Sequence, residues 1–326
     1  MTSVDGTPTD TDTAAATEPC PRCGSPIFDG ERFCEACGAP VAPVDVPVTE
    51  PVAEPPEERA GPTEVDLDAV GGVTDRGYRR TRNEDAVAGA SGIGWSAAVV
   101  CDGVASTSRA HLASRAAART ALAVLEAGAP ATTDDGAAAL VSGALAEAQR
   151  AVTSVAGDTR SDLELAPSTT AVVVLVRGNV LHVGSVGDSR AYWLGASGSG
   201  RTLTTDDSLA QDRIAEGTAP DVAYDDPDAH TITRWLGADA EPAEPAITTI
   251  ALEEPGLVVV CTDGLWNYVE EPEQLAEAAG DWSGLRPIEV ARRLLAVALD
   301  AGGQDNITVA VLPVDGATAP GPADLP

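Results

Sequence analysis

Two apolar runs that each end in an aspartate and a glycine constrain this chain more than any other feature. The stretches WSAAVVCDGVA and LVVVCTDGLW are typical of buried β-strands, and they deliver Asp102 and Asp263 to their tips. A carboxylate among apolar neighbours is costly unless it faces a cation. The glycines that follow, Gly103 and Gly264, let the backbone approach such a cation and offer a carbonyl as a ligand. The two tips are therefore predicted to be halves of one cation site.

Further acidic residues occupy the same kind of position. The stretches RRTRNEDAV, VGDSRAYW and GGQDNITVAVL place Glu84, Asp85, Asp188 and Asp305 beside apolar, strand-like runs. A single aspartate next to glycine or asparagine is usually a turn residue or a helix cap, but repetition of the pattern favours a shared site. Oxygen ligands that leave room for water suit Mg²⁺ or Mn²⁺.

Composition excludes several classes of function. The formal net charge is -31, from 20 basic and 51 acidic residues, which opposes binding to nucleic acid or to an anionic membrane. The sequence contains no lysine, so P-loop and Schiff-base lysine chemistry are excluded. It shows no secretory leader and no apolar run near the roughly 20 residues that span a bilayer. We therefore expect a cytoplasmic monomer.

Changes in composition divide the chain into five parts. We expect a disordered N-terminus at 1–19, a small cysteine module at 20–38, a flexible Pro- and Glu-rich linker at 39–64, one large domain at 65–315, and a disordered tail at 316–326. Within the large domain, strands are expected at 64–74, 95–101, 247–252, 257–261 and 306–313, with a hairpin turn at Gly178-Asn179. Helices are expected at 107–127, 134–156 and 287–300. Strands that cluster in hairpins favour an antiparallel sheet core with helices outside.

The cysteine module contains two C-x-x-C pairs separated by ten residues, namely Cys20, Cys23, Cys34 and Cys37. Four thiolates fill the tetrahedral coordination of Zn²⁺, so this metal would be structural. A redox pair is the alternative, but it would not need duplication. The module resembles a small zinc ribbon, and its net negative charge favours protein docking or a structural role over DNA binding.

Several residues near these motifs have an ordinary structural interpretation. Cys101 and Cys261 are expected to be small buried residues, and Arg190 an ion-pair partner. Asp188 is expected to be a structural carboxylate in its hairpin, with a role as a ligand relay as the alternative. Asn306 is expected to orient Asp305 and fix a turn. The histidines, which are His111, His182 and His230, lie outside the acidic motifs and are expected to be packing or surface residues.

The chain contains, in order, the motifs RRTRNEDA, VVCDGV, STTAVVVL, VGDSRAYW, LTTDDSL, VVCTDGLWNYV and QDNITVAV. By these motifs it resembles, over about residues 70–312, the metal-dependent protein phosphatases, the type 2C serine/threonine phosphatases of bacterial type. The resemblance implies an α+β fold, a four-layer α-β-β-α sandwich of two antiparallel sheets flanked by helices, with the zinc ribbon on a flexible linker.

The resemblance also implies residue roles. The metal ligands would be Asp102, Gly103, Asp263, Asp305 and either Glu84 or Asp85. By this resemblance Asp102 bridges two Mn²⁺ or Mg²⁺ ions, the Gly103 carbonyl binds one of them, and Asp263 and Asp305 bind the other. Arg80 would grip the substrate phosphate. Bacterial members can add a third ion through the position of Asp263 and an acid before the Thr-Thr strand, for which Asp162 is the candidate.

Two departures from the family pattern bear on chemistry. The stretch DGVAS has no histidine that could protonate the leaving group, and LAPSTT lacks the usual glycine-rich turn, which places the loop of the third ion in doubt. The expected function is hydrolysis of phosphoserine and phosphothreonine in proteins by a metal-activated water at a binuclear centre, opposing a Ser/Thr kinase. The alternative is a regulatory or scaffold protein of low activity that recruits partners through the ribbon.

Overall fold

The computed structural model describes residues 16–19, 26–28, 62–107, 109–156, 166–240 and 245–316. Contacts divide the chain into two compact units, Met1–Pro55 and Pro56–Pro326. In the first unit, β1 (Ala16–Pro19) pairs antiparallel with β2 (Pro26–Phe28). The four cysteines predicted to bind zinc lie outside the described residues.

Two antiparallel sheets form the second unit. The first sheet has the order β11-β10-β14-β15-β4-β3 and the second has the order β13-β9-β8-β6-β5. The strands of the first are β3 (Thr63–Leu67), β4 (Val70–Asp75), β10 (Arg190–Gly195), β11 (Gly200–Thr202), β14 (Gly256–Cys261) and β15 (Ile307–Val314). Those of the second are β5 (Ala86–Gly92), β6 (Trp95–Cys101), β8 (Ala171–Arg177), β9 (Val180–Val186) and β13 (Ala246–Ala251). A short pair, β7 (Ser168–Thr169) with β12 (Leu236–Gly237), forms a separate ladder.

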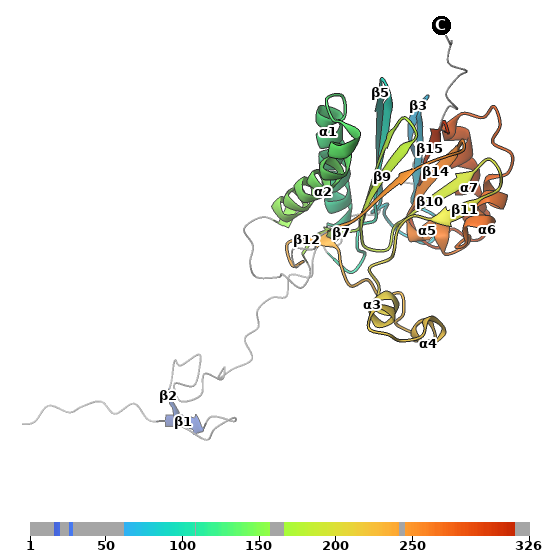
Figure 1. The fold of residues 1–326 in the computed structure, drawn as a ribbon. Coiled ribbons are helices and arrows are strands. Elements are labelled where there is room, and N and C mark those ends of the chain that lie inside the picture. The colour runs from blue at the N-terminus through green and yellow to red at the C-terminus, as the bar shows by residue number, and fades with distance from the viewer. Residues whose placement is uncertain are drawn as a thin grey trace, which may run out of the picture. The chain divides into compact units, whose positions relative to one another are not determined.

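Helices cover the outer face of each sheet, as Figure 1 shows. Helices α1 (Ala110–Gly128) and α2 (Asp134–Ala156) pack on the five-stranded sheet, and α6 (Pro272–Ala279) and α7 (Pro287–Asp300) cover the six-stranded one. The four-layer α-β-β-α sandwich expected from the sequence is confirmed. None of the helices in the described part of the chain is both long enough and apolar enough to cross a membrane.

The central strands are apolar throughout because both faces are covered. In β6, Val99 and Cys101 pack toward α1 and α2, whereas Ala98 and Val100 pack between the two sheets. The same alternation in β14 sends Val259 toward α7 and its neighbours into the core between the sheets. A strand buried on both sides shows no polar alternation, which is why these runs stand out in the sequence.

The start of the large domain differs from the expectation. The single strand expected at 64–74 is a hairpin of β3 and β4, and β3 begins at Thr63, inside the segment expected to be linker. Strand β3 pairs with β4 along its length, and it also forms partly exposed ion pairs, Glu64 with Arg292 and Asp66 with Arg286. These pairs form across more than 200 residues of sequence, so no local pattern signals them.

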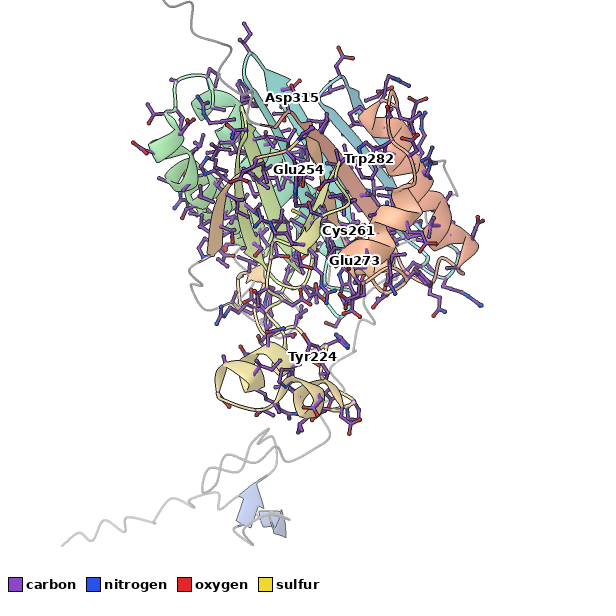
Figure 2. All side chains as sticks on the ribbon, turned by 45° about the vertical axis from the view of Figure 1, so that its right-hand side comes forward. Tyr224, Glu254, Cys261, Glu273, Trp282 and Asp315 are labelled. Carbon is purple, nitrogen blue, oxygen red and sulfur yellow. The ribbon has the colours of Figure 1, made fainter. Side chains whose placement is uncertain are left out.

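A small helical segment lies between β11 and β12, and the sequence analysis did not predict it. It contains α3 (Leu209–Ala215) and α4 (Pro220–Tyr224), and in Figure 1 it projects beyond the ends of the sheets. Its core is three buried alanines with Ile214 packed against them. Figure 2 labels Tyr224 on this segment, well separated from Cys261 inside the sandwich.

Candidate active site

Strand ends bring the acidic motifs together at one edge of the two sheets. Strand β6 ends at Cys101, immediately before Asp102, and β14 ends at Cys261, two residues before Asp263. Strand β15 begins two residues after Asp305. Because β14 and β15 are antiparallel neighbours, the end of the first and the start of the second lie at the same edge of their sheet.

A cavity of about 130 Å³ opens between these strand ends. Arg80, Glu84, Asp102, Gly103, Asp188, Asp263 and Asp305 line it, together with Val104, Ala105, Thr170, Ile232 and Asn306. The structure thus places most of the residues expected in the site around one cavity. Asp162 lies outside the described residues.

Glu84 and Asp85 face different surroundings. Glu84 lines the cavity, whereas Asp85 does not line it and is buried, with 3% of its surface exposed. One carboxylate oxygen of Asp85, Oδ2, accepts hydrogen bonds from the hydroxyls of Thr262 (2.9 Å) and Thr308 (2.7 Å). Its other oxygen, Oδ1, has no hydrogen-bond donor among the described residues. Glu84 is therefore the acid of the pair that points to the cavity.

The carboxylates raise one another's proton affinity. Burial, followed by the charges of Asp85 and Asp263, raises the pKa of Asp102 well above its usual range. Burial and the nearby Asp305 raise the pKa of Asp263 to about 6. Burial and the charge of Asp263 raise the pKa of Asp188 to about 7. Negative charge is therefore in excess at this edge.

Arg80 is the cationic side chain among the described residues that line the cavity. Its guanidinium Nη2 lies 2.5 Å from Oδ2 of Asp305, and the charges of Asp102 and Asp263 also hold the pKa of Arg80 above its ordinary value. One monovalent cation does not balance the surrounding carboxylates, and divalent cations would. The oxygen-rich donor set of the cavity fits Mg²⁺ or Mn²⁺. As the side chains stand, no three His, Cys, Asp or Glu residues in the described part of the chain converge on a single ion position.

The two glycines at the strand tips are required by close backbone packing. A Cβ on Gly103 would lie 2.5 Å from the Glu84 carbonyl oxygen, and one on Gly264 would lie 1.9 Å from the Asn306 carbonyl oxygen. No side chain fits at either distance. The glycines therefore let separate segments of the chain come into contact, in addition to the role expected for them beside a cation.

Hydroxyl side chains fix the tip that carries Asp102. The backbone N–H of Asp102 donates to Thr170 Oγ1 (3.1 Å), and its carbonyl accepts from the Thr170 N–H (2.8 Å) and from Thr169 Oγ1 (2.8 Å). This Thr-Thr pair belongs to the motif STTAVVVL, whose sequence alone indicates no such role. Ile232, which reaches the cavity from beyond α4, was missed because no local pattern marks it.

The ordinary interpretations of nearby residues agree with the structure. Cys101 and Cys261 are buried free thiols. Arg190 pairs with Asp206 (2.7 Å) and Glu270 (3.2 Å), and its guanidinium lies 3.9 Å from the ring centre of Trp266. Asp188 lines the cavity, and its role as a structural carboxylate or as a ligand relay stays a prediction.

The histidines take packing and surface positions. His111 is buried and lies 3.1 Å from Arg82, and the buried His182 lies 3.0 Å from Thr249. His230 is exposed, and its ring centre lies 6.0 Å from that of Trp266. None of the three lines the cavity.

Comparison with known proteins agrees with the geometry. The family model of protein phosphatase 2C matches residues 75–296, which is more than half of the chain, and a zinc-ribbon domain model matches residues 20–41. The serine/threonine protein phosphatase PstP of Mycobacterium tuberculosis is 34% identical over 152 residues, 45% of this chain and 27% of PstP. A putative protein phosphatase 2C-type of Streptococcus pyogenes is 30% identical over 146 residues, 44% of this chain and 57% of that protein. The matched part is thus well short of the full length of these curated relatives.

Solved structures are similar over most of the chain. The crystal structure of PstP/Ppp from M. tuberculosis has a TM-score of 0.61 at 28% identity and covers 76% of this chain and 98% of its own. The catalytic domain of PstP in complex with two manganese ions has a TM-score of 0.59 at 29% identity, with coverages of 78% and 100%. The phosphatase MsPP from Mycobacterium smegmatis, in complex with cacodylate, has a TM-score of 0.59 at 30% identity, with the same coverages. Because the family model matches more than half of its residues, the chain belongs to the protein phosphatase 2C family.

Proposed function

We propose that the chain is a metal-dependent protein phosphatase that hydrolyses phosphoserine and phosphothreonine in proteins. The observation that carries the proposal is the cavity in which Asp102, Asp263 and Asp305 meet Glu84 and Arg80. The similarity to PstP, named as a serine/threonine protein phosphatase, supports the choice of substrate class. Phosphorylated proteins are then its partners, and a Ser/Thr kinase supplies them.

The cavity residues would hold two divalent cations, Mn²⁺ or Mg²⁺. Asp102 would bridge them, Glu84 and the Gly103 carbonyl would bind one, and Asp263 and Asp305 the other. The PstP structure that contains two manganese ions supports this number. Bound there, the ions would polarise the phosphoryl oxygens and lower the pKa of bound water toward neutral pH.

Arg80 has a separate role, which is to bind the substrate. Its guanidinium presents two parallel N–H groups, the arrangement that matches two oxygens of a phosphoryl group. Hydrogen bonds to a group whose charge grows during the reaction stabilise the transition state more than the ground state. We therefore assign to Arg80 both the binding and the orientation of the phosphate.

No histidine is among the described residues that line the cavity, and Val104 and Ala105 follow Gly103 at its wall. The described cavity thus offers the leaving alcohol no imidazole as a proton donor. We propose that water donates this proton, as expected from the stretch DGVAS.

For a third ion, Asp188 is a second candidate ligand beside Asp162, which lies outside the described residues. Asp188 lines the same cavity, and the charge of Asp263 contributes to its raised pKa, which indicates that the two carboxylates are neighbours. We propose Asp188 with Asp263 as the ligands of this third ion. At the N-terminus, the match to a zinc-ribbon model supports a structural Zn²⁺ held by Cys20, Cys23, Cys34 and Cys37.

The direct test measures phosphate release from a phosphothreonine peptide with and without Mn²⁺, using the full chain. Asp263→Asn should abolish the Mn²⁺-dependent turnover because it removes a ligand charge from the cavity. Asp300→Asn is the matched control, since Asp300 is exposed at the end of α7. Equal turnover by the wild type and Asp263→Asn would reject the role proposed for this carboxylate.

A further inference from the structure

Asn306 is a buried carboxamide whose three side-chain hydrogen bonds all go to one loop. It follows Asp305 directly, and 4% of its surface is exposed. Its Nδ2 donates to the carbonyl oxygens of Arg76 and Arg82, both at 2.9 Å, and its Oδ1 accepts from the N–H of Glu84 at 2.8 Å. The side chain thus uses both of its donors and its acceptor on the backbone of residues 76–84.

The loop of residues 76–84 contains two residues of the proposed site, Arg80 and Glu84. It connects β4 to β5 and contains no helix or strand of its own. Asn306 joins two points of this loop, because its Nδ2 donates to the carbonyls of Arg76 and Arg82, which are six positions apart. A loop without regular structure holds its side chains in place only as well as its backbone contacts allow.

The backbone around Asn306 is itself fixed to the other acidic tip. A Cβ added to Gly264 would lie 1.9 Å from the carbonyl oxygen of Asn306, so these two segments are in close contact. The N–H of Asn306 also donates to Oδ1 of Asp305 at 2.8 Å. One residue therefore links the loop that carries Arg80 to the segments that carry Asp263 and Asp305.

We propose that Asn306 is a positioning residue that holds the loop of residues 76–84, and so sets the guanidinium of Arg80 against the acids of the cavity. The inference rests on the proposed function for its catalytic consequence, but the positioning itself is independent of it. Asparagine is required because only a carboxamide offers two donors and an acceptor in this arrangement. An aspartate would present an acceptor to two carbonyl oxygens, and an alanine would remove all three hydrogen bonds to the loop.

The test compares Asn306→Ala and Asn306→Asp in the full chain with Asn179→Ala as the matched control. The Asn179 side chain also donates to a backbone carbonyl, that of Leu252 at 3.0 Å, but at the turn between β8 and β9. Thermal melting first establishes the temperature at which each variant is folded. Exchange of the amide hydrogens in residues 76–85 is then measured without any substrate.

Loss of protection in residues 76–85 is the expected result for Asn306→Ala, and the control should retain it. Asn306→Asp should keep protection at the Glu84 amide, because it retains the acceptor, while the rest of the loop loses it. Unchanged protection in Asn306→Ala would overturn the proposal. This readout stands even if the wild type releases no phosphate, a result that would reject the proposed function alone.

Kinetics provide the second readout. Asn306→Ala should lower kcat/KM for a phosphothreonine peptide by about 10- to 100-fold, the range for a misplaced binding group. If Asn306 acts through Arg80, adding Arg80→Ala to Asn306→Ala should cost much less than Arg80→Ala costs in the wild type. Losses that multiply fully in the double variant would mean that Asn306 does not act through Arg80, and would overturn the positioning role.

Discussion

Substitution of Arg80 by alanine should strengthen the binding of Mn²⁺ in the cavity and weaken catalysis on a phosphothreonine peptide. The Arg80 side chain is 39% exposed and lies 2.5 Å from Asp305, whose side chain is 27% exposed. An ion pair as exposed as this one contributes about 0–1 kcal/mol, so Arg80→Ala should leave the free energy of unfolding nearly unchanged.

The affinity for Mn²⁺ should rise in this variant. Removal of Arg80 leaves Asp305 without its competing partner and removes a positive charge that acts on Asp102 and Asp263. If the pair is worth about 1 kcal/mol, the dissociation constant for Mn²⁺ should fall about fivefold. In Arg80→Ala, kcat/KM for a phosphothreonine peptide should fall about 10- to 150-fold, because charge-assisted hydrogen bonds to the phosphate are worth about 1.5–3 kcal/mol.

Calorimetric titration with Mn²⁺ and steady-state kinetics on the same preparations measure both effects. Arg80→Lys is the control, since it keeps the charge but loses the planar fork. It should bind Mn²⁺ like the wild type and still lose part of kcat/KM. Weaker Mn²⁺ binding by Arg80→Ala would refute the reasoning, because it would show that Arg80 supports the cation site and does not compete with it.

Three further predictions concern stability. Burial raises the pKa of Asp85 from 3.8 to about 7, so between these values the folded protein holds a proton that the unfolded chain releases. The metal-free protein should therefore lose stability as the pH rises from about 4 to 7. Melting curves across this range should show a smaller loss for Asp85→Asn, and an equal loss would contradict the raised pKa of Asp85. Gly264→Ala should destabilise the protein by about 1–3 kcal/mol in urea unfolding, because its Cβ would meet the backbone of Asn306, and unchanged stability would show that these segments are not in close contact. Arg190→Met should lower the free energy of unfolding by about 3–5 kcal/mol, because it leaves Asp206 buried without its partner. The double variant Arg190→Met with Asp206→Leu should recover much of this loss in urea unfolding. Losses that add in the double variant would contradict a buried ion pair.

Much of the fold was predictable because the central strands are apolar on both faces. Helix α2 and the hairpin at Gly178 have the expected bounds, since each is defined by local signals. The hairpin of β3 and β4 was expected as one strand because only Asp68 and Ala69 lie between the two strands. The segment of α3 and α4 was missed because its small alanine core produces no strong periodicity.

The site was predictable as a set of acids but not as an arrangement. Each strand-Asp-Gly tip is visible in the sequence, and the topology of the two sheets then determines that the tips meet. Which of Glu84 and Asp85 faces the cavity depends on the hydroxyls of Thr262 and Thr308, which come from distant segments. The cavity position of Asp188 likewise follows from tertiary packing.

The central claim is that acids from separate segments form one site for divalent cations, and Mn²⁺ binding tests it most directly. Electron paramagnetic resonance counts bound Mn²⁺ in the full chain without interference from Zn²⁺, which is silent in this measurement. The account predicts at least two Mn²⁺ ions per wild-type chain, as in the PstP structure with two manganese ions, and a loss of binding in Asp102→Asn. A wild-type chain that binds no Mn²⁺, or an Asp102→Asn variant that binds as many ions as the wild type, would contradict it.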